Sequence, residues 1–390
     1  MSFFLEESDR LKALPPYLFV EIDRAKKKAI ENGKDVIDFG VGDPDGPTPD
    51  FVIRAMRKAI RDPWTHHYPL DRGNALFRRA VSGWVKNRFG RSFDPESEVL
   101  PLIGSKEGLS HLPLAFLNPG DVALVPDPCY PPYKSAVLFA GGEPQLLPLK
   151  EENGFLPDWE AVPAPVLKRA KLIFVNYPNN PTGVTAPRAF YEKLVGWAVK
   201  NRILIVSDLA YSEVYFGKER PLSIFEIDGA REAAVEFHSL SKTCNMTGWR
   251  LGFALGRREI VDRLLRIKAN MDSGVFTAIQ HAGVEALRHS PSFTRKANRL
   301  YRERRDALVG GLRDLGFPVR PNEATFYVFT GLPGGRADST LFCKNLLETC
   351  GIVATPGVGF GAAGEGYVRF ALTVPVPRIK EAITRMKKSF

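Results

Sequence analysis

Five short apolar runs in the central part of the chain constrain its fold more than any other feature. They are continuous rather than alternating in polarity, which is typical of strands buried on both faces. The segments between them, such as residues 186–201, carry helical periodicity. This alternation predicts an open, mostly parallel α/β sheet covered by helices. The runs are VALVP (122–126), LIFVNYP (172–178), RILIVSD (202–208), AAVEFHS (233–239) and GFALG (252–256).

The pattern changes near residue 290. A long charged helix is predicted to begin at Ser292 and to end at a glycine, and short strands with further helices follow it. Near the other end of the chain, apolar residues from Tyr17 to about Ile30 lie on one helical face. We therefore expect an N-terminal segment that packs with a small C-terminal α+β domain, and a large domain between them. The expected bounds are 1–45, 291–390 and 46–290, respectively.

Polar residues end three of the predicted strands. Asn176, Asp208 and Ser239 each close an apolar run. In open α/β sheets, ligands bind in the crevice at the carboxyl ends of the strands. These three side chains are therefore predicted to face one crevice. Further polar residues follow the strand ends at once, and among them are Asn180, Tyr211, Ser241 and Lys242.

This set of residues fits one kind of cofactor chemistry. A lysine among apolar neighbours and other cations has a lowered pKa and becomes a nucleophilic amine. Such an amine can bind an aldehyde cofactor, and in pyridoxal phosphate the pyridine nitrogen also requires a carboxylate. Lys242 and Asp208 would fill these two roles. Asn180 and Tyr211 would donate hydrogen bonds to the phenolate oxygen.

A phosphate group would need hydroxyls, a guanidinium and backbone N–H groups. Ser239 and Ser241 offer hydroxyls beside Lys242, and Arg250 offers a guanidinium. The segment GSKEG (104–108) leads into a helical pattern, so Ser105 and Lys106 would open a helix whose N-terminal N–H groups face the phosphate. His66, His67 and His238 are interpreted as packing or capping residues, and no metal site is expected.

At this point the sequence resembles the class I/II (fold type I) pyridoxal-phosphate enzymes of the aspartate aminotransferase type. The resemblance spans the whole chain and depends on four ordered motifs, NNPTG, D-x-A-Y, S-x-S-K and G-W-R-x-G. The separations Asn180–Asp208, Asp208–Lys242 and Lys242–Arg250 also suit the family. The resemblance implies a large domain with a mostly parallel seven-stranded sheet, a smaller α+β domain and transamination by a ping-pong mechanism.

The resemblance also implies roles for individual residues. Lys242 would form the Schiff base with the cofactor and then move a proton between Cα and C4′. Tyr130 would stack on the cofactor ring, and Gly42 would lie in a loop near the substrate. Arg369 would clamp the α-carboxylate of the substrate in a bidentate fork. Tyr68 would reach the phosphate of a partner subunit, so a homodimer with shared active sites is implied.

Within this family, segments 8–29, 38–49 and 104–108 look similar to LL-diaminopimelate aminotransferases, which transfer an amino group to 2-oxoglutarate in lysine biosynthesis. On that resemblance Tyr17 would line the substrate pocket. Ser273 would be a polar residue contributed by the partner, although its local motif departs from the family's asparagine-glycine pattern. Alanine or aspartate transamination is the alternative, and a C–S lyase of the same fold is a further one. Segment 268–280 has no arginine after Lys268, which disfavours one mode of aspartate binding.

The composition limits the classes of partner and the cellular compartment that we expect for this chain. The formal net charge is +10, but the basic residues are spread along the chain, so nucleic-acid binding is not expected. The four cysteines lack C-x-x-C spacing, which argues against a zinc cluster and a disulfide framework and favours the reducing cytoplasm. No apolar run approaches the roughly 20 residues of a membrane span, and no secretory signal is visible at the N-terminus.

Overall fold

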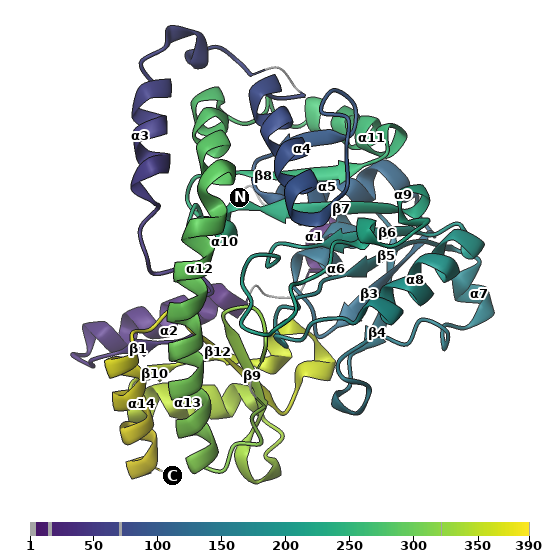
Figure 1. Cartoon of the computed structure of the whole chain (residues 1–390). Helices are drawn as coiled ribbons and strands as arrows, with labels where there is room; N and C mark the ends of the chain where they lie inside the picture. The colour runs from purple at the N-terminus through teal and green to yellow at the C-terminus, as the bar shows by residue number, and fades with distance from the viewer. Residues whose placement is uncertain (1–4, 15–17, 70–71, 321, 390) are drawn as a thin grey trace.

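The computed structural model describes residues 5–14, 18–69, 72–320 and 322–389. They form a larger unit around a seven-stranded sheet and a smaller unit that contains the C-terminus (Figure 1). The sheet order is β2-β8-β7-β6-β5-β3-β4, and β8 is antiparallel to both of its neighbours. The strands are β2 (Val99–Leu102), β3 (Val122–Asp127), β4 (Glu143–Pro148), β5 (Ala170–Val175), β6 (Leu204–Asp208), β7 (Ala234–Ser239) and β8 (Gly252–Gly256).

Both faces of this sheet are buried, which confirms the prediction from the continuous apolar runs. Along β5, Leu172 and Phe174 belong to one apolar core, whereas Ile173 and Val175 belong to the core on the opposite face. Side chains of successive strand residues point to opposite faces, so an uninterrupted apolar run is needed to fill both cores. The core that contains Leu172 and Phe174 also includes apolar residues of α5 (Ser105–Phe116), α6 (Pro132–Phe139) and α11 (Arg258–Ala269). The core that contains Ile173 and Val175 includes apolar residues of α4 (Ala75–Phe89) and α8 (Arg188–Asn201).

The smaller unit has its own apolar core. Its three-stranded antiparallel sheet has the order β11-β12-β9, and β1 pairs with β10 in parallel. Phe39, which follows β1, is fully buried in this core together with residues of the C-terminal region. The elements are α2 (Leu18–Glu31), β1 (Ile37–Asp38), β9 (Tyr327–Gly331), α13 (Ser339–Cys350), β10 (Ile352–Val353), β11 (Thr355–Pro356), β12 (Tyr367–Ala371) and α14 (Val376–Ser389).

The long helix α12 (Thr277–Asp314) differs from its prediction. It begins well before Ser292 and continues through Pro291, because residues on both sides of the proline are buried against neighbouring elements. Burial of this kind can outweigh the helix-breaking tendency of proline. The helix runs from the larger unit into the smaller one (Figure 1), so the predicted boundary near residue 290 falls inside it.

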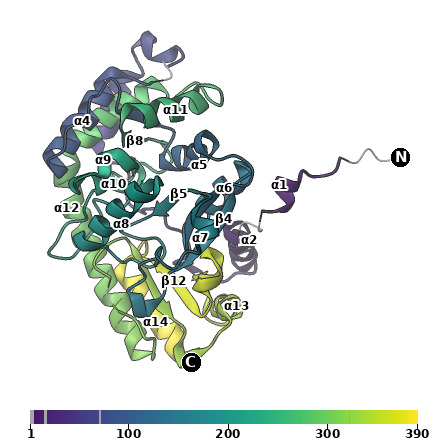
Figure 2. The ribbon, with the colours of Figure 1, turned by 90° about the vertical axis from the view of Figure 1, so that its right-hand side faces the viewer.

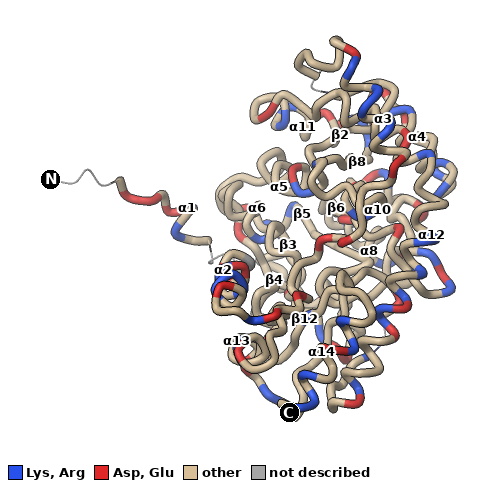
Figure 3. The backbone as a smooth tube through the Cα atoms, turned by 90° about the vertical axis from the view of Figure 1, so that its left-hand side faces the viewer, with Lys and Arg blue, Asp and Glu red and all other residues tan. Residues whose placement is uncertain are grey.

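The remaining helices are short or peripheral. In Figure 2, α1 (Asp9–Lys12) stands away from the body of the molecule, and none of its residues is buried. Acidic and basic residues are interspersed over the side drawn in Figure 3. Among the described residues, no helix combines the length and the apolarity needed to cross a bilayer. The other helices are α3 (Asp50–Ala59), α7 (Ala164–Leu167), α9 (Ala230–Ala233) and α10 (Leu240–Thr243).

Candidate active site

A cavity of about 260 Å³ lies at the carboxyl ends of β5, β6 and β7. This volume far exceeds the roughly 30 Å³ that one water molecule occupies in the liquid, so the cavity can hold a small organic molecule. The three strand-end residues Asn176, Asp208 and Ser239 all line it, as predicted. Most of the other predicted site residues line it too: Gly42, Ser105, Lys106, Tyr130, Asn180, Tyr211, Ser241, Lys242, Arg250 and Arg369.

Lys242 lies in the short helix α10, directly after β7. Its Nζ donates a hydrogen bond to the carbonyl oxygen of Gly42 at 2.8 Å. Burial lowers the pKa of Lys242 to about 8, and the positive charges of Arg369 and Arg250 act in the same direction. The neutral, nucleophilic amine is therefore far more populated near neutral pH than for an ordinary lysine, at about one molecule in ten at pH 7.

Asp208 ends β6 and is a buried residue of the cavity wall. Its Oδ2 accepts a hydrogen bond from the Tyr133 hydroxyl at 2.6 Å, and its Oδ1 accepts one from the Ala210 N–H at 3.2 Å. Burial raises the pKa of this carboxyl to about 6, whereas both hydrogen bonds and the nearby Lys242 oppose the rise. The carboxylate is thus mainly ionised at neutral pH and can pair with a cationic group in the cavity.

Arg369 and Asn180 connect the two units at the edge of the cavity. Arg369 lies in β12 of the smaller unit, and its Nη1 donates to the Asn180 Oδ1 at 2.8 Å. Its Nη2 donates to the carbonyl oxygen of Gly40 at 2.9 Å, and its guanidinium lies 4.1 Å from the centre of the Tyr327 ring. Because Oδ1 of Asn180 already accepts from Arg369, the amide can offer its N–H groups to a ligand.

Arg250, Ser105, Ser239 and Ser241 also line the cavity. Arg250 has a φ of +56°, which is uncommon for a residue with a Cβ. Its guanidinium packs so closely over Gly104 that a Cβ at Gly104 would lie 2.4 Å from Nη2. Gly104 directly precedes α5, so the guanidinium and the N-terminus of that helix meet at one place. Hydroxyls, a guanidinium and helix N–H groups are the donors that a phosphate group needs.

Two predicted residues are not part of this cavity, and a third cannot be placed. Tyr68 is 87% exposed and Ser273 is also exposed, and neither lines the cavity of a single chain. Both were predicted to act across a subunit interface, and these roles stay predictions. Tyr17 lies outside the described residues.

Several residues near the cavity were missed by the sequence reasoning. Tyr133 lies beneath the cavity and bonds Asp208, and Tyr327 bonds the Tyr211 hydroxyl with an O···O distance of 3.0 Å. Tyr133 follows the predicted Tyr130 by three residues at the start of a helix, which was the available signal. Nothing in the sequence linked it to Asp208. Asp43, Ala210 and Thr247 also line the cavity.

The interpretation of His238 as a packing residue agrees with its surroundings. Its ring stacks on Phe253 with centroids 4.8 Å apart, and its Nε2 lies 2.9 Å from Glu236 Oε1. Within the described part of the chain, one group of metal-ligand types converges, formed by Glu107, His111 and Asp272. The ammonium of Lys268 contacts both carboxylates, so a protein cation already occupies the space between them.

Comparison with known proteins agrees with this geometry. The model for aminotransferase class I and II matches residues 34–386. The chain belongs to the class I and II aminotransferase family. Family membership and the two-unit architecture with its seven-stranded sheet confirm the predicted fold class and the predicted enzyme class.

Relatives of this aminotransferase are similar over nearly their whole length. The LL-diaminopimelate aminotransferase of Halothermothrix orenii is 53% identical over 385 residues, which is 99% of each chain. That of Syntrophobacter fumaroxidans is 54% identical over 382 residues, or 98% of each chain. Among solved structures, substrate-bound BacF from Bacillus subtilis superimposes with a TM-score of 0.95 at 36% identity and covers 99% of this chain and 98% of its own. A single mutant of Thermus thermophilus aspartate aminotransferase gives 0.93 at 30% identity, with 99% and 100% covered.

Proposed function

We propose that this aminotransferase uses pyridoxal 5′-phosphate to transfer an amino group between LL-diaminopimelate and 2-oxoglutarate in lysine biosynthesis. The observation that carries the cofactor proposal is the half-buried amine of Lys242, which faces the same cavity as the buried carboxylate of Asp208. The substrate proposal draws on relatives of that printed name at more than half identity over nearly full length.

The donors around the cavity fit this cofactor. Ser239, Ser241 and Arg250, together with the first turn of α5, would hold the phosphate. Asp208 would pair with the pyridine nitrogen. The remaining predicted contacts are Tyr130 against the ring, Asn180 and Tyr211 toward the phenolate oxygen, and Ser105 and Lys106 at the phosphate.

The chain's own groups then support the reaction. When bound, the cofactor supplies an aldehyde and an electron-withdrawing ring. Arg369 binds and orients the α-carboxylate of the substrate, and Gly42 lies in the adjacent loop. Lys242 moves a proton at the α-carbon of the substrate, because its lowered pKa lets the amine accept and return a proton near neutral pH.

We also propose that the enzyme is a cytoplasmic homodimer with shared active sites. Tyr68 and Ser273 are exposed in a single chain, and a second copy would give them the phosphate and substrate contacts that the resemblance implies. The four cysteines are free and buried, as expected of a protein from a reducing compartment. Tyr17 would complete the substrate pocket.

The decisive experiment is a panel of amino donors offered to the purified enzyme with 2-oxoglutarate or pyruvate. We expect LL-diaminopimelate with 2-oxoglutarate to give the highest kcat/KM. A higher value with alanine or aspartate would assign one of those substrates instead, and release of ammonia and a thiol from a cysteine conjugate would indicate a C–S lyase. Borohydride is expected to fix the cofactor to Lys242. A purified enzyme that binds no pyridoxal phosphate would refute the proposal as a whole.

A further inference from the structure

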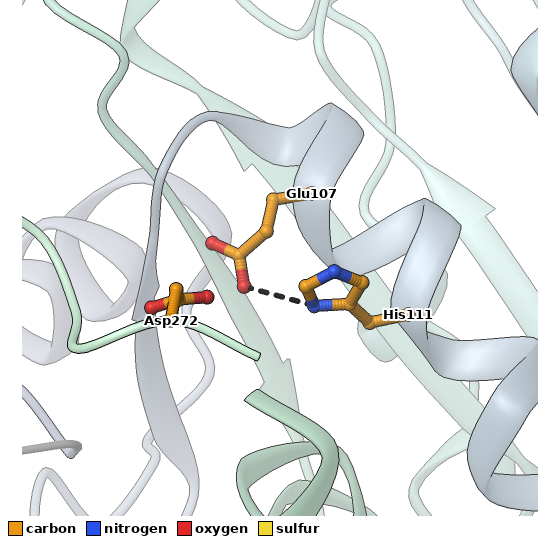
Figure 4. Close-up of side chains that lie close together, drawn as sticks. All are labelled: Glu107, His111 and Asp272. Atoms are coloured by element: carbon orange, nitrogen blue, oxygen red, sulfur yellow. Dashed lines mark ion pairs between the residues drawn. The ribbon is translucent and has the colours of Figure 1, made fainter. Parts of the chain in front are cut away.

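A fully buried lysine lies at the centre of a charged cluster next to Ser105 and Lys106. These two residues line the cavity in the first turn of α5, and we call this part of the cavity its phosphate end. Lys268, near the end of α11, is only 1% exposed. Its Nζ donates to both carboxylate oxygens of Glu107 at 3.1 Å and to Asp272 Oδ1 at 2.7 Å. Figure 4 shows Glu107 and His111 on one helix and Asp272 on the segment that faces them, with the ion pair between Glu107 and His111 dashed.

This cluster is attached directly to the first turn of α5. Glu107 is an acidic residue of that turn, and its Oε2 accepts a hydrogen bond from the Ile103 N–H at 2.6 Å. Ser105 and Lys106, which line the cavity, occupy the same turn. Asp272 Oδ1 also accepts from the Gly274 N–H at 2.6 Å, so the cluster joins this turn to the segment that follows α11.

The charge of Glu107 presents a conflict at this position. A carboxylate in the first turn stabilises the helix through its dipole. The same negative charge opposes the binding of an anion at the same N-terminus. The conflict is resolved if a cation is held against the carboxylate on the side away from the ligand, where solvent cannot screen it away.

We infer that Lys268 is a positioning residue for the phosphate end of the cavity: it neutralises Glu107 within the first turn of α5 and fixes that turn against the segment that follows α11. Lys268 does not line the cavity, so it acts on a bound phosphate only through Glu107 and the helix. This inference rests on the proposed function, because it requires that the cavity binds a phosphate group.

The cluster allows its charge to be changed in steps. Lys268, Glu107 and Asp272 carry a net formal charge of −1. Lys268→Met makes it −2, Glu107→Gln makes it zero, and the double variant Lys268→Met/Glu107→Gln returns it to −1. Arg258→Met is the matched control, because it removes an exposed ion pair with Asp262 on the same helix, α11.

The experiment measures the affinity of the cofactor-free full chain for inorganic phosphate, pyridoxal phosphate and pyridoxal. We expect phosphate and pyridoxal phosphate to bind about threefold to tenfold more weakly to Lys268→Met and more tightly to Glu107→Gln, as for charges separated by an effective dielectric constant near 20. The double variant and the control should be close to the wild type. Pyridoxal, which has no phosphate, should bind all five proteins alike.

Two outcomes would overturn the inference while leaving the proposed function intact. One is equal phosphate affinity in all variants that fold. The other is a double variant as weak as Lys268→Met, since loss of the ion pair rather than charge would then be the cause. If Lys268→Met does not fold, Glu107→Gln alone decides, because unchanged or weaker phosphate binding contradicts neutralisation. A wild type that binds neither phosphate nor pyridoxal phosphate would instead refute the proposed function.

Discussion

Tyr133→Phe tests how the charge of Asp208 is controlled. The substitution removes the hydroxyl that donates to Asp208 Oδ2 and keeps the ring, which stacks on Phe174. A hydrogen bond to a charged group contributes about 1.5–3 kcal/mol, and one pKa unit corresponds to about 1.4 kcal/mol. We therefore expect the pKa of Asp208 to rise by about one to two units above its value of about 6.

The consequence for the cofactor-free protein follows from proton binding. Burial raises the folded pKa of Asp208 above the ordinary value of 3.8. The folded state therefore binds more protons than the unfolded state between these two values, and stability falls as the pH rises from about 4 to about 6. In Tyr133→Phe this fall should continue to about pH 7 or 8. The variant should lose about 1.3–2.6 kcal/mol more than the wild type between pH 5 and pH 9.

Urea unfolding of the cofactor-free protein from pH 5 to pH 9 measures this difference. Tyr177→Phe is the matched control, because the buried Tyr177 hydroxyl donates to the neutral carbonyl oxygen of Phe155 at 2.7 Å. Its loss should lower the free energy of unfolding by the same amount at every pH in this range. If Tyr133→Phe gives a similarly constant offset, the hydroxyl does not control the ionisation of Asp208 and the reasoning is wrong.

Three further predictions concern the same cavity. Gly104→Ala forces a Cβ against the Arg250 guanidinium at a φ of +74°. We therefore expect thermal unfolding to show about 1–3 kcal/mol of destabilisation, and titration to show weaker cofactor binding. Wild-type values in both measurements would contradict the packing argument. Because the pKa of Lys242 is lowered to about 8, its reaction with pyridoxal phosphate should accelerate as the pH rises to about 8 and then level off. Stopped-flow absorbance measures this rate, and a rate independent of pH from 6 to 10 would contradict the lowered pKa. Arg369→Lys keeps the positive charge but loses the planar guanidinium, whose Nη1 donates to Asn180. The KM for the amino donor should therefore rise about tenfold in steady-state assays. An unaltered KM would argue against carboxylate binding at this position.

The strands of the larger unit were predictable because local pattern and burial agree there. The run from 202 to 208 forms β6 from Leu204 to Asp208, and its last residue lies at the cavity as the strand-end rule requires. The direction of β8 was not predictable, because an apolar run of five residues has the same pattern in a parallel and an antiparallel pair.

Features that depend on distant contacts were the ones that the sequence reasoning missed. Tyr133 and Asp208 are 75 residues apart, and no local pattern indicates that their side chains meet. The start of α12 was placed too late because the sequence pattern changes near residue 290, whereas packing on both sides of Pro291 keeps the helix continuous. Local propensity could not reveal that this helix has partners in two separate cores.

The packing of α12 into both cores has a consequence for how the protein unfolds. Ala286 and Leu287 of α12 belong to the core beneath the large sheet, whereas Leu308 and Leu312 belong to the core of the smaller unit. Melting either core would expose one half of a helix whose other half the remaining core still needs. We therefore expect the two units to unfold together, and a rotation between them has to bend the continuous helix α12.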